Sequence, residues 1–253
     1  GLLIKMNQMY SVAPDIETAS PGYALRFRGE SGSFFLERQK DIVLSLIQNS
    51  RTDLRILEIG GGHAQLTPYL LEKGYQVWIQ ASSEEALTKA RQLESRYPDR
   101  CTPFVSSLFE LPFEADKFDI VIGLRLVCHV PQWEELLSEI CRVAKAQVII
   151  DYPPKGSFNL LYPLAFPAKK VLEGNSTRPF RRFRTKELTE RFAKFGFHSF
   201  QEKREFFFPM VFHRLINRSA LSRRLEMLCC AIGLTRFFGS PAVLSATDLL
   251  VGG

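Results

Sequence analysis

The run EIGGGHA at residues 58–64 is the part of the sequence with the clearest chemical meaning. It follows a short β-rich run and precedes residues with helical spacing. Glycines in such a turn let the backbone bend sharply, and they let a ligand approach main-chain N–H groups. The run therefore predicts a ligand-binding loop, the alternative being a purely structural turn.

Three polar side chains elsewhere are candidates for a part in catalysis. His129 follows a predicted buried strand, and because histidine titrates near neutral pH it is a candidate general base; alternatively it hydrogen-bonds a loop. Arg125 lies at the end of the same strand, where its guanidinium could hold an anionic group or simply lie at the surface. Asp151 ends another strand and would orient an acceptor nucleophile or cap the next turn. The other histidines lack a ligand partner at close spacing, so we expect no metal site.

Hydrophobic patterning predicts the elements that must position these residues. Strands are expected at residues 54–59, 76–81, 102–106, 118–124, 147–150, 197–208 and 242–246. Helices are expected at 34–48 with Ser33 as cap, 64–73, from 82 to before Pro98, 133–143, 185–195 and within 210–238. This alternation predicts an α/β fold: a Rossmann-like, doubly wound, mostly parallel seven-stranded sheet with helices on both faces. In that fold ligands bind beyond the carboxyl ends of the strands.

The chain is interpreted as one domain over residues 1–253. Residues 1–50 would form an N-terminal wrap and helix, 51–151 the binding core, and 152–253 a lid, a helical insert and closing strands. Residues 152–184 contain five prolines and several aromatic side chains. A connection of that length predicts a lid or substrate loop.

Composition is that of a globular protein, with 45% hydrophobic and 24% charged residues among 253. Five cysteines without repeated close spacing argue against a disulfide scaffold and a zinc ribbon. No apolar run approaches the ~18 residues needed to cross a bilayer, and the apolar N-terminal run is too short for a signal peptide. A cytoplasmic protein is expected, with peripheral membrane contact as an alternative.

The net charge of +6 is unevenly distributed. Residues 152–240 hold 17 Lys and Arg against 6 Asp and Glu, with the densest cluster at residues 178–184. This predicts an anionic partner, either an anionic acceptor or a membrane surface, the alternative being a solvated basic face. Nucleic acid ranks last because no nucleic-acid-binding module accompanies the cluster. Residues 210–238 could lie on a membrane through an apolar face, although a core-facing helix is the favoured interpretation.

Two blocks of sequence resemble a known family. The run RILEIGGG at residues 55–62 resembles the first motif of class I S-adenosylmethionine-dependent methyltransferases. The runs LPF at 111–113, FDIVI at 118–122, HVP at 129–131 and EICRV at 139–143 are similar in order and spacing to the type 11 branch. The resemblance covers residues 54–151. It implies a methyltransferase with S-adenosylmethionine as methyl donor, S-adenosylhomocysteine as product and a small or lipid-like acceptor.

The resemblance also implies a set of donor-binding residues. The predicted set is Glu58, Gly60, Gly61, Gly62, Ala81, Ser82, Ser107, Leu108 and Tyr23, the last in a segment that can fold over the donor in similar methyltransferases. The loop from Glu58 to Gly62 would hold the amino-acid part of the donor. The third glycine of the motif is replaced by Ala64, a mild departure if this residue lies on the helix.

Two departures from the family pattern leave a second hypothesis open. The acid that binds the ribose hydroxyls is replaced by Ala81, and the Asp that holds the adenine amino group by Ser107. A lost carboxylate contact forfeits about 1.5–3 kcal/mol unless another group replaces it. Residues near enough in sequence to do so are Gln80, Ser82, Ser83, Glu84 and Glu110. The alternative function is a methyltransferase-like binding or scaffold protein with weak or lost donor affinity.

Overall fold

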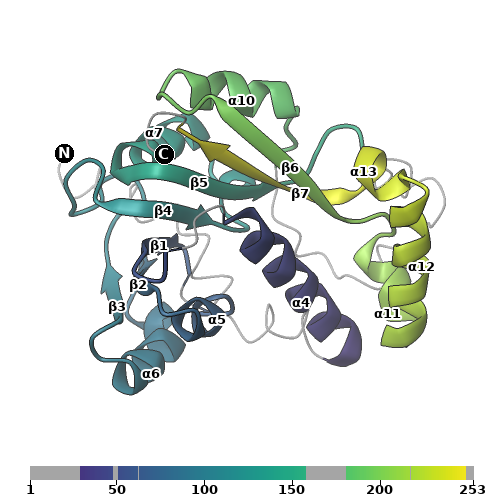
Figure 1. The fold of residues 1–253 in the computed structure, drawn as a ribbon, viewed down its shortest axis with the longest axis horizontal. Helices are drawn as coiled ribbons and strands as arrows, with labels where there is room; N and C mark the ends of the chain where they lie inside the picture. Colours follow the sequence, from purple (N-terminus) through teal and green to yellow (C-terminus); the bar gives the residue numbers. More distant parts are fainter. Residues whose placement is uncertain (1–28, 48–50, 62, 158–180, 217, 249–253) are drawn as a thin grey trace.

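A seven-stranded sheet is the centre of the computed structural model, which describes residues 29–47, 51–61, 63–157, 181–216 and 218–248 (Figure 1). The strands are β1 (Arg55–Ile59), β2 (Gln76–Ala81), β3 (Cys101–Val105), β4 (Phe118–Gly123), β5 (Ala144–Tyr152), β6 (Ser199–Phe206) and β7 (Ser240–Thr247). Their order is β3-β2-β1-β4-β5-β7-β6. The first five strands are parallel, and β7 is antiparallel to both β5 and β6. The predicted fold is confirmed.

Helices cover both faces of this sheet. They are α4 (Gly29–Leu46), α5 (Thr67–Glu72), η1 (Glu85–Leu87), α6 (Thr88–Arg96), η2 (Val127–His129), α7 (Trp133–Val143), α10 (Thr185–Ala193), α11 (Met210–Ile216), α12 (Ser219–Ala231) and α13 (Leu234–Phe238). Alternate strand residues face opposite sides, as pleated strands require. Leu57 and Val121 pack with the apolar residues of α7 and α10, whereas Ile56 and Ile122 pack with those of α4, α5 and α6.

Four helices differ from the predicted ones. The helix expected from residue 82 begins as the 3-10 helix η1 at Glu85 and continues as α6 from Thr88. α4 begins at Gly29, so Ser33 lies inside the helix and is not its cap. α5 begins at Thr67 instead of residue 64, with Pro68 in its first turn, a position that suits proline. The predicted helical stretch 210–238 is divided into three helices, with left-handed Gly233 between α12 and α13.

The strand order reverses between β1 and β4. From β1 the chain continues outward to β2 and β3, and it then crosses the sheet to β4 on the other side of β1. In doubly wound sheets, ligands bind in the crevice that this reversal opens beyond the strand ends. The loops that follow Ile59 and Gly123 therefore flank the place where a ligand is expected.

The described ends of the predicted lid are anchored to the core. Phe183 is fully buried, with ring centroids 5.2 Å from Trp133 and 6.3 Å from Tyr152. Its N–H donates to Pro153 O at 3.1 Å, and its carbonyl accepts from Lys155 N at 2.9 Å. The remainder of this predicted lid, residues 158–180, lies outside the described residues.

Replacing Phe183 by alanine should destabilise the fold. The substitution removes a fully buried ring and leaves a cavity between β5 and α7, so we expect the free energy of unfolding to fall by about 3–5 kcal/mol. Phe200→Ala is the matched control because that ring is 37% exposed, and its expected cost is below about 1 kcal/mol. Urea denaturation of both variants checks this, and equal losses would contradict it.

Candidate active site

The turn after β1 has a geometry that only glycine fits. Gly60 has a φ of +65°, in the left-handed region. A Cβ at Gly61 would lie 2.9 Å from Glu58 Cβ and 3.3 Å from Ile79 Cγ2. Ala64, which replaces the third glycine of the motif, has a φ of 49° and precedes α5 by three residues. The prediction that Ala64 lies on a helix is therefore wrong. Alanine there occupies a conformation that glycine adopts without strain.

A buried glutamine holds this turn against the neighbouring strands. The Gln80 side chain is fully buried, and its Oε1 accepts from Gly60 N at 3.0 Å while its Nε2 donates to Ser106 O at 2.8 Å. The Gln80 carbonyl also accepts from Gly61 N at 3.2 Å. Gln80 is therefore engaged with the loop, and its amide is not placed to replace the ribose-binding acid.

Glu58 precedes the turn and is one of the buried carboxyl groups of the site. Thr67 Oγ1 donates a short hydrogen bond to Glu58 Oε2. Burial raises the pKa of Glu58 to about 7, although the Thr67 hydrogen bond and the charge of Arg125 act in the opposite direction. Near neutral pH this carboxyl group can therefore lose or gain a proton.

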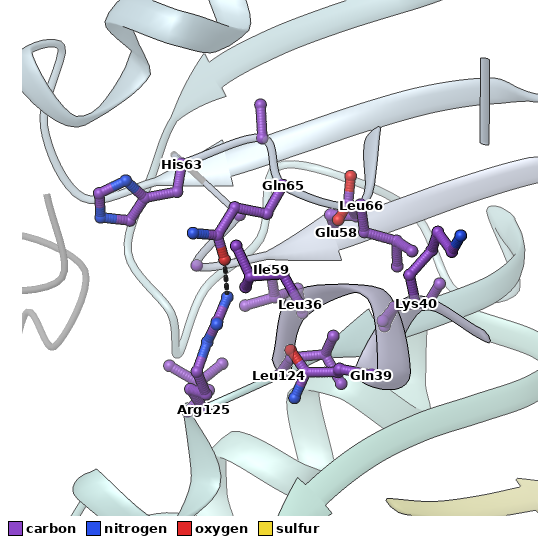
Figure 2. Close-up of a pocket in the computed structure, with 15 residues that line it drawn as sticks. Leu36, Gln39, Lys40, Glu58, Ile59, His63, Gln65, Leu66, Leu124 and Arg125 are labelled. Atoms are coloured by element: carbon purple, nitrogen blue, oxygen red, sulfur yellow. Dashed lines mark hydrogen bonds between the residues drawn. The ribbon is translucent and has the colours of Figure 1, made fainter. Parts of the chain in front are cut away.

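Arg125 connects the two loops that flank the crevice. It has a φ of 55°, and its N–H donates to Asp151 Oδ1 at 2.5 Å. Its guanidinium donates to Gln65 Oε1 at 2.6 Å, across the space between the β1 and β4 loops (Figure 2). Asp151 therefore fixes the backbone of Arg125 from the adjacent strand.

The amide of Gln39 on α4 lies between two buried carboxyl groups. Gln39 Nε2 donates to Asp151 Oδ2 at 3.2 Å and to Glu205 Oε1 at 3.1 Å. Burial raises the pKa of Asp151 to about 6, against the hydrogen bond from Arg125. Burial and the nearby Asp151 charge raise the pKa of Glu205 to about 8. These contacts join α4 to β5 and β6.

A pocket opens at this junction, between α4 and the loops after β1 and β4. Its polar lining side chains are Gln39, Lys40, Glu58, His63, Gln65 and Arg125, and Figure 2 shows them arranged around Ile59 and Leu36. Lys40 forms an ion pair with Asp41 at 2.9 Å and lies over the Tyr69 ring. Burial, with the charges of Lys89 and Arg125, lowers the pKa of His63 to about 4, so this imidazole is neutral at pH 7.

The structure brings together only part of the predicted site. Glu58, Gly60, Gly61 and Arg125 line the pocket. Asp151 lies behind Arg125, whereas His129 on η2 is not among the lining residues. Gly62 and Tyr23 lie outside the described residues.

The predicted residues after β2 and β3 do not line this pocket. Ala81 is fully buried at the end of β2, followed by half-buried Ser82. Ser107 Oγ accepts from Phe109 N at 3.1 Å, and Leu108 packs in the core. Of the suggested replacements for the ribose-binding acid, Ser83 accepts from Ala86 N, Glu84 binds Arg91 and Glu110 is exposed.

Three polar lining residues lie outside both the run at residues 58–64 and the predicted site. Gln39 and Lys40 come from α4, and Gln65 comes from the β1 loop. The helix of Gln39 and Lys40 was predicted, but not its position beside the strand ends. No local signal distinguished them, because residues 37–41 are all polar and such residues usually lie at the surface.

Comparison with known sequences finds a similarity to methyltransferase domains in the central part of the chain. Residues 57–150 match the family model described as a methyltransferase domain. An uncharacterized methyltransferase of Schizosaccharomyces pombe is 31% identical over 104 residues. That alignment covers 38% of this chain and 37% of the relative.

Solved structures share the fold at low sequence identity. The methyltransferase in the Haloferax volcanii complex with the Trm112 methyltransferase activator has a TM-score of 0.61 at 15% identity, covering 93% of this chain and 98% of that one. Magnesium protoporphyrin IX methyltransferase from Synechocystis with bound S-adenosylhomocysteine scores 0.58 at 16%, covering 87% and 85%. Phosphoethanolamine N-methyltransferase 2 of Haemonchus contortus scores 0.58 at 19%, covering 83% and 52%.

The strand order and the glycine turn at its point of reversal define a class I methyltransferase fold. Residues 57–150 are thus similar to a methyltransferase domain, and the chain shares its fold with solved class I methyltransferases. Among the described residues, no group of three or more His, Cys, Asp or Glu side chains could hold a metal ion, and no helix is long and apolar enough to cross a membrane.

Replacing Gln80 by leucine should loosen the glycine turn. The variant leaves Gly60 N and Ser106 O without their buried partner, so we expect a loss of about 1–3 kcal/mol in the free energy of unfolding. Gln76→Leu, on an exposed position of the same strand, is the control and should change stability by about 0.5 kcal/mol or less. Denaturant titration measures both, and matching curves would contradict the role given to Gln80.

Raising the pH should weaken the fold through its buried carboxyl groups. The pKa of Glu205 is higher in the folded chain than in an unfolded one, so its contribution is fully present below about pH 4.5 and is lost as the pH rises towards 8. We expect Glu205→Gln to be about 1–3 kcal/mol more stable than the native chain near pH 8 and similar near pH 4. Glu110→Gln, at an exposed site, should follow the native pH curve. Parallel curves for Glu205→Gln and the native chain would refute this.

Proposed function

We propose that the chain transfers a methyl group from S-adenosylmethionine to a small or lipid-like acceptor. The observation that carries this proposal is the glycine turn, in which no side chain fits at Gly61, beside a pocket with Glu58 in its wall. The matched domain and the relative named a methyltransferase support it. The Synechocystis neighbour with bound S-adenosylhomocysteine has the same fold.

The residues of the pocket fit the amino-acid part of the donor. The Glu58 carboxylate, next to the glycine turn, suits an ammonium group, and the cations of Lys40 and Arg125 suit a carboxylate. When bound, S-adenosylmethionine supplies a methyl group on a sulfonium centre. Because Gln65 binds the guanidinium of Arg125 and Asp151 binds its backbone N–H, this side chain is oriented before any ligand arrives.

The nucleoside part of the donor has fewer polar partners. Ala81 offers no acceptor for ribose hydroxyls, and Ser107 already accepts from Phe109 N. Main-chain groups and apolar contacts would then hold the nucleoside, at a loss of about 1.5–3 kcal/mol relative to a carboxylate contact. The same observation favours the second candidate function, a methyltransferase-like scaffold protein with weak or lost donor affinity.

Small-molecule acceptors occur among the structural neighbours. The Haemonchus enzyme was crystallised with phosphomonomethylethanolamine, and the Synechocystis enzyme is named for magnesium protoporphyrin IX. For this chain we propose that Arg125 holds an anionic group of the acceptor or of the donor. We propose His129, whose main-chain N–H donates to the carbonyl of the lining residue Leu126, as general base towards an acceptor bound at the edge of the pocket. Asp151 does not line the pocket, but it binds Arg125 and Gln39, which do. We therefore assign it a positioning role.

Calorimetry with S-adenosylmethionine and S-adenosylhomocysteine separates the two candidate functions. We expect the native chain to bind and the Gly61→Ala variant to bind at least about tenfold more weakly. The Cβ that this substitution adds would collide with Glu58 and Ile79 and displace the turn. Gly156→Ala is the matched control because an added Cβ there has open space around it, and its affinity should equal that of the native chain.

Two results would decide against the enzyme. No heat with either ligand at millimolar concentration, from a chain shown to be folded, favours the scaffold function. Equal affinity of Gly61→Ala and Gly156→Ala would place the ligand away from the glycine turn. If binding is observed, methyl transfer from tritiated donor to a lipid extract or to a water-soluble extract identifies the acceptor class.

A further inference from the structure

The buried side of α12 is polar and its exposed side is apolar. Ser222, Glu226 and Cys229 are the buried residues of this helix. Its large apolar side chains are exposed instead, with exposed fractions of 44% for Leu221, 63% for Met227 and 59% for Leu228. Ile232, the residue that follows the helix, is 64% exposed. The favoured prediction of a core-facing helix is therefore wrong for α12. A globular protein normally turns such a stripe inward, and an exposed apolar patch marks an interaction site.

The exposed apolar residues form one continuous stripe. With 3.6 residues per turn, Leu221, Arg224, Met227, Leu228 and Ile232 fall within an arc of about 140°. The short helix α13, which contacts α12, adds Phe237 at 64% and Phe238 at 48% exposure. We call these seven residues, together with Arg236 on α13, the α12–α13 surface; it lies at one end of the molecule (Figure 1).

The charges of this surface are all positive. Arg218, Arg224 and Arg236 are exposed on or beside the two helices. Glu226 is the only acidic residue between positions 218 and 239, and it is buried. Its carboxylate accepts from Phe207 N and Phe208 N at 2.9 and 3.0 Å, and it contacts His213 Nε2 at 2.9 Å. The buried carboxylate thus fixes the helix with its apolar stripe outward.

Further contacts tie α12 to the helix that lines the pocket. Arg223 Nη2 lies 2.5 Å from Glu37 Oε2, and the same guanidinium lies over the Phe34 ring at 4.8 Å. Ser219 N donates to Glu30 Oε2 at 3.1 Å. All three partners belong to α4, which also carries Gln39 and Lys40 of the pocket. The α12–α13 surface is therefore connected to the pocket wall through one helix.

We propose that the α12–α13 surface docks on an anionic lipid bilayer. Leucine, isoleucine, methionine and phenylalanine side chains bordered by arginines are typical of helices that lie in a bilayer interface, where the cations bind lipid phosphates. A second copy of the chain fits this surface less well, because a two-fold contact would bring two positively charged patches together. The proposal is independent of the methyl donor, so donor binding and membrane binding can fail separately.

Vesicle flotation with the full 253-residue chain tests the proposal. We expect the chain to float with phosphatidylcholine–phosphatidylglycerol vesicles, to float less with phosphatidylcholine alone, and to dissociate as salt is raised. The apolar variant Leu228→Ser, Ile232→Ser, Phe237→Ser should reduce the bound fraction by roughly tenfold. The charge variant Arg224→Glu, Arg236→Glu should remove the preference for anionic vesicles.

Matched controls alter the same chemistry elsewhere on the molecule. Val105→Ser, Phe200→Ser removes exposed apolar side chains from the sheet, and Lys186→Glu reverses an exposed charge on α10; both should float like the native chain. The proposal is overturned if the native chain stays in solution with both vesicle types or if patch and control variants float equally. A concentration-dependent dimer that the apolar variant abolishes, without flotation, would assign the surface to a second copy.

Discussion

The carboxamide of Gln80 joins the ends of three neighbouring parallel strands, and the binding turn depends on it. One amide accepts from the backbone after β1 and donates to the backbone after β3, while its own residue belongs to β2. Because both ends of the amide are used and the group is fully buried, its orientation is fixed. The glycine turn therefore keeps its shape through a side chain, and Gly60 N–H is satisfied by the protein instead of being presented to a ligand.

A second constraint holds α4 beside the pocket. Asp151 and Glu205 are buried on different strands, and the Gln39 amide is the donor that both share. Burial favours the protonated form of each carboxyl group. The hydrogen bonds from Gln39 therefore stabilise the cluster, whereas ionisation of either carboxyl group destabilises it. Through Arg125, the same cluster also sets the backbone after β4. One buried polar network thus joins the pocket wall on α4 to strands β5 and β6 and to the loop after β4.

Local patterns predicted the sheet well because its central strands β1, β4 and β5 contain short apolar runs that are buried on both faces. The bounds of β2 match the prediction at both ends, and the other strands differ by a few residues. The site was predicted less completely. Gln39 and Gln65 are separated from their partners Asp151 and Arg125 by 112 and 60 residues, and local spacing carries no information about such pairs. Ala64 was placed on a helix because its left-handed backbone is not visible in its residue type.

The sequence by itself determined the alternation of strands and helices, the position of the glycine turn and the absence of a carboxylate at Ala81, because these are properties of residue type and period. Only the tertiary structure decided which groups face each other at the reversal of strand order. It also decided the direction of α12, because a helical period shows which residues share a face but not whether that face turns inward. Here the buried Glu226, fixed by backbone N–H groups of a neighbouring segment, directs the apolar stripe towards solvent.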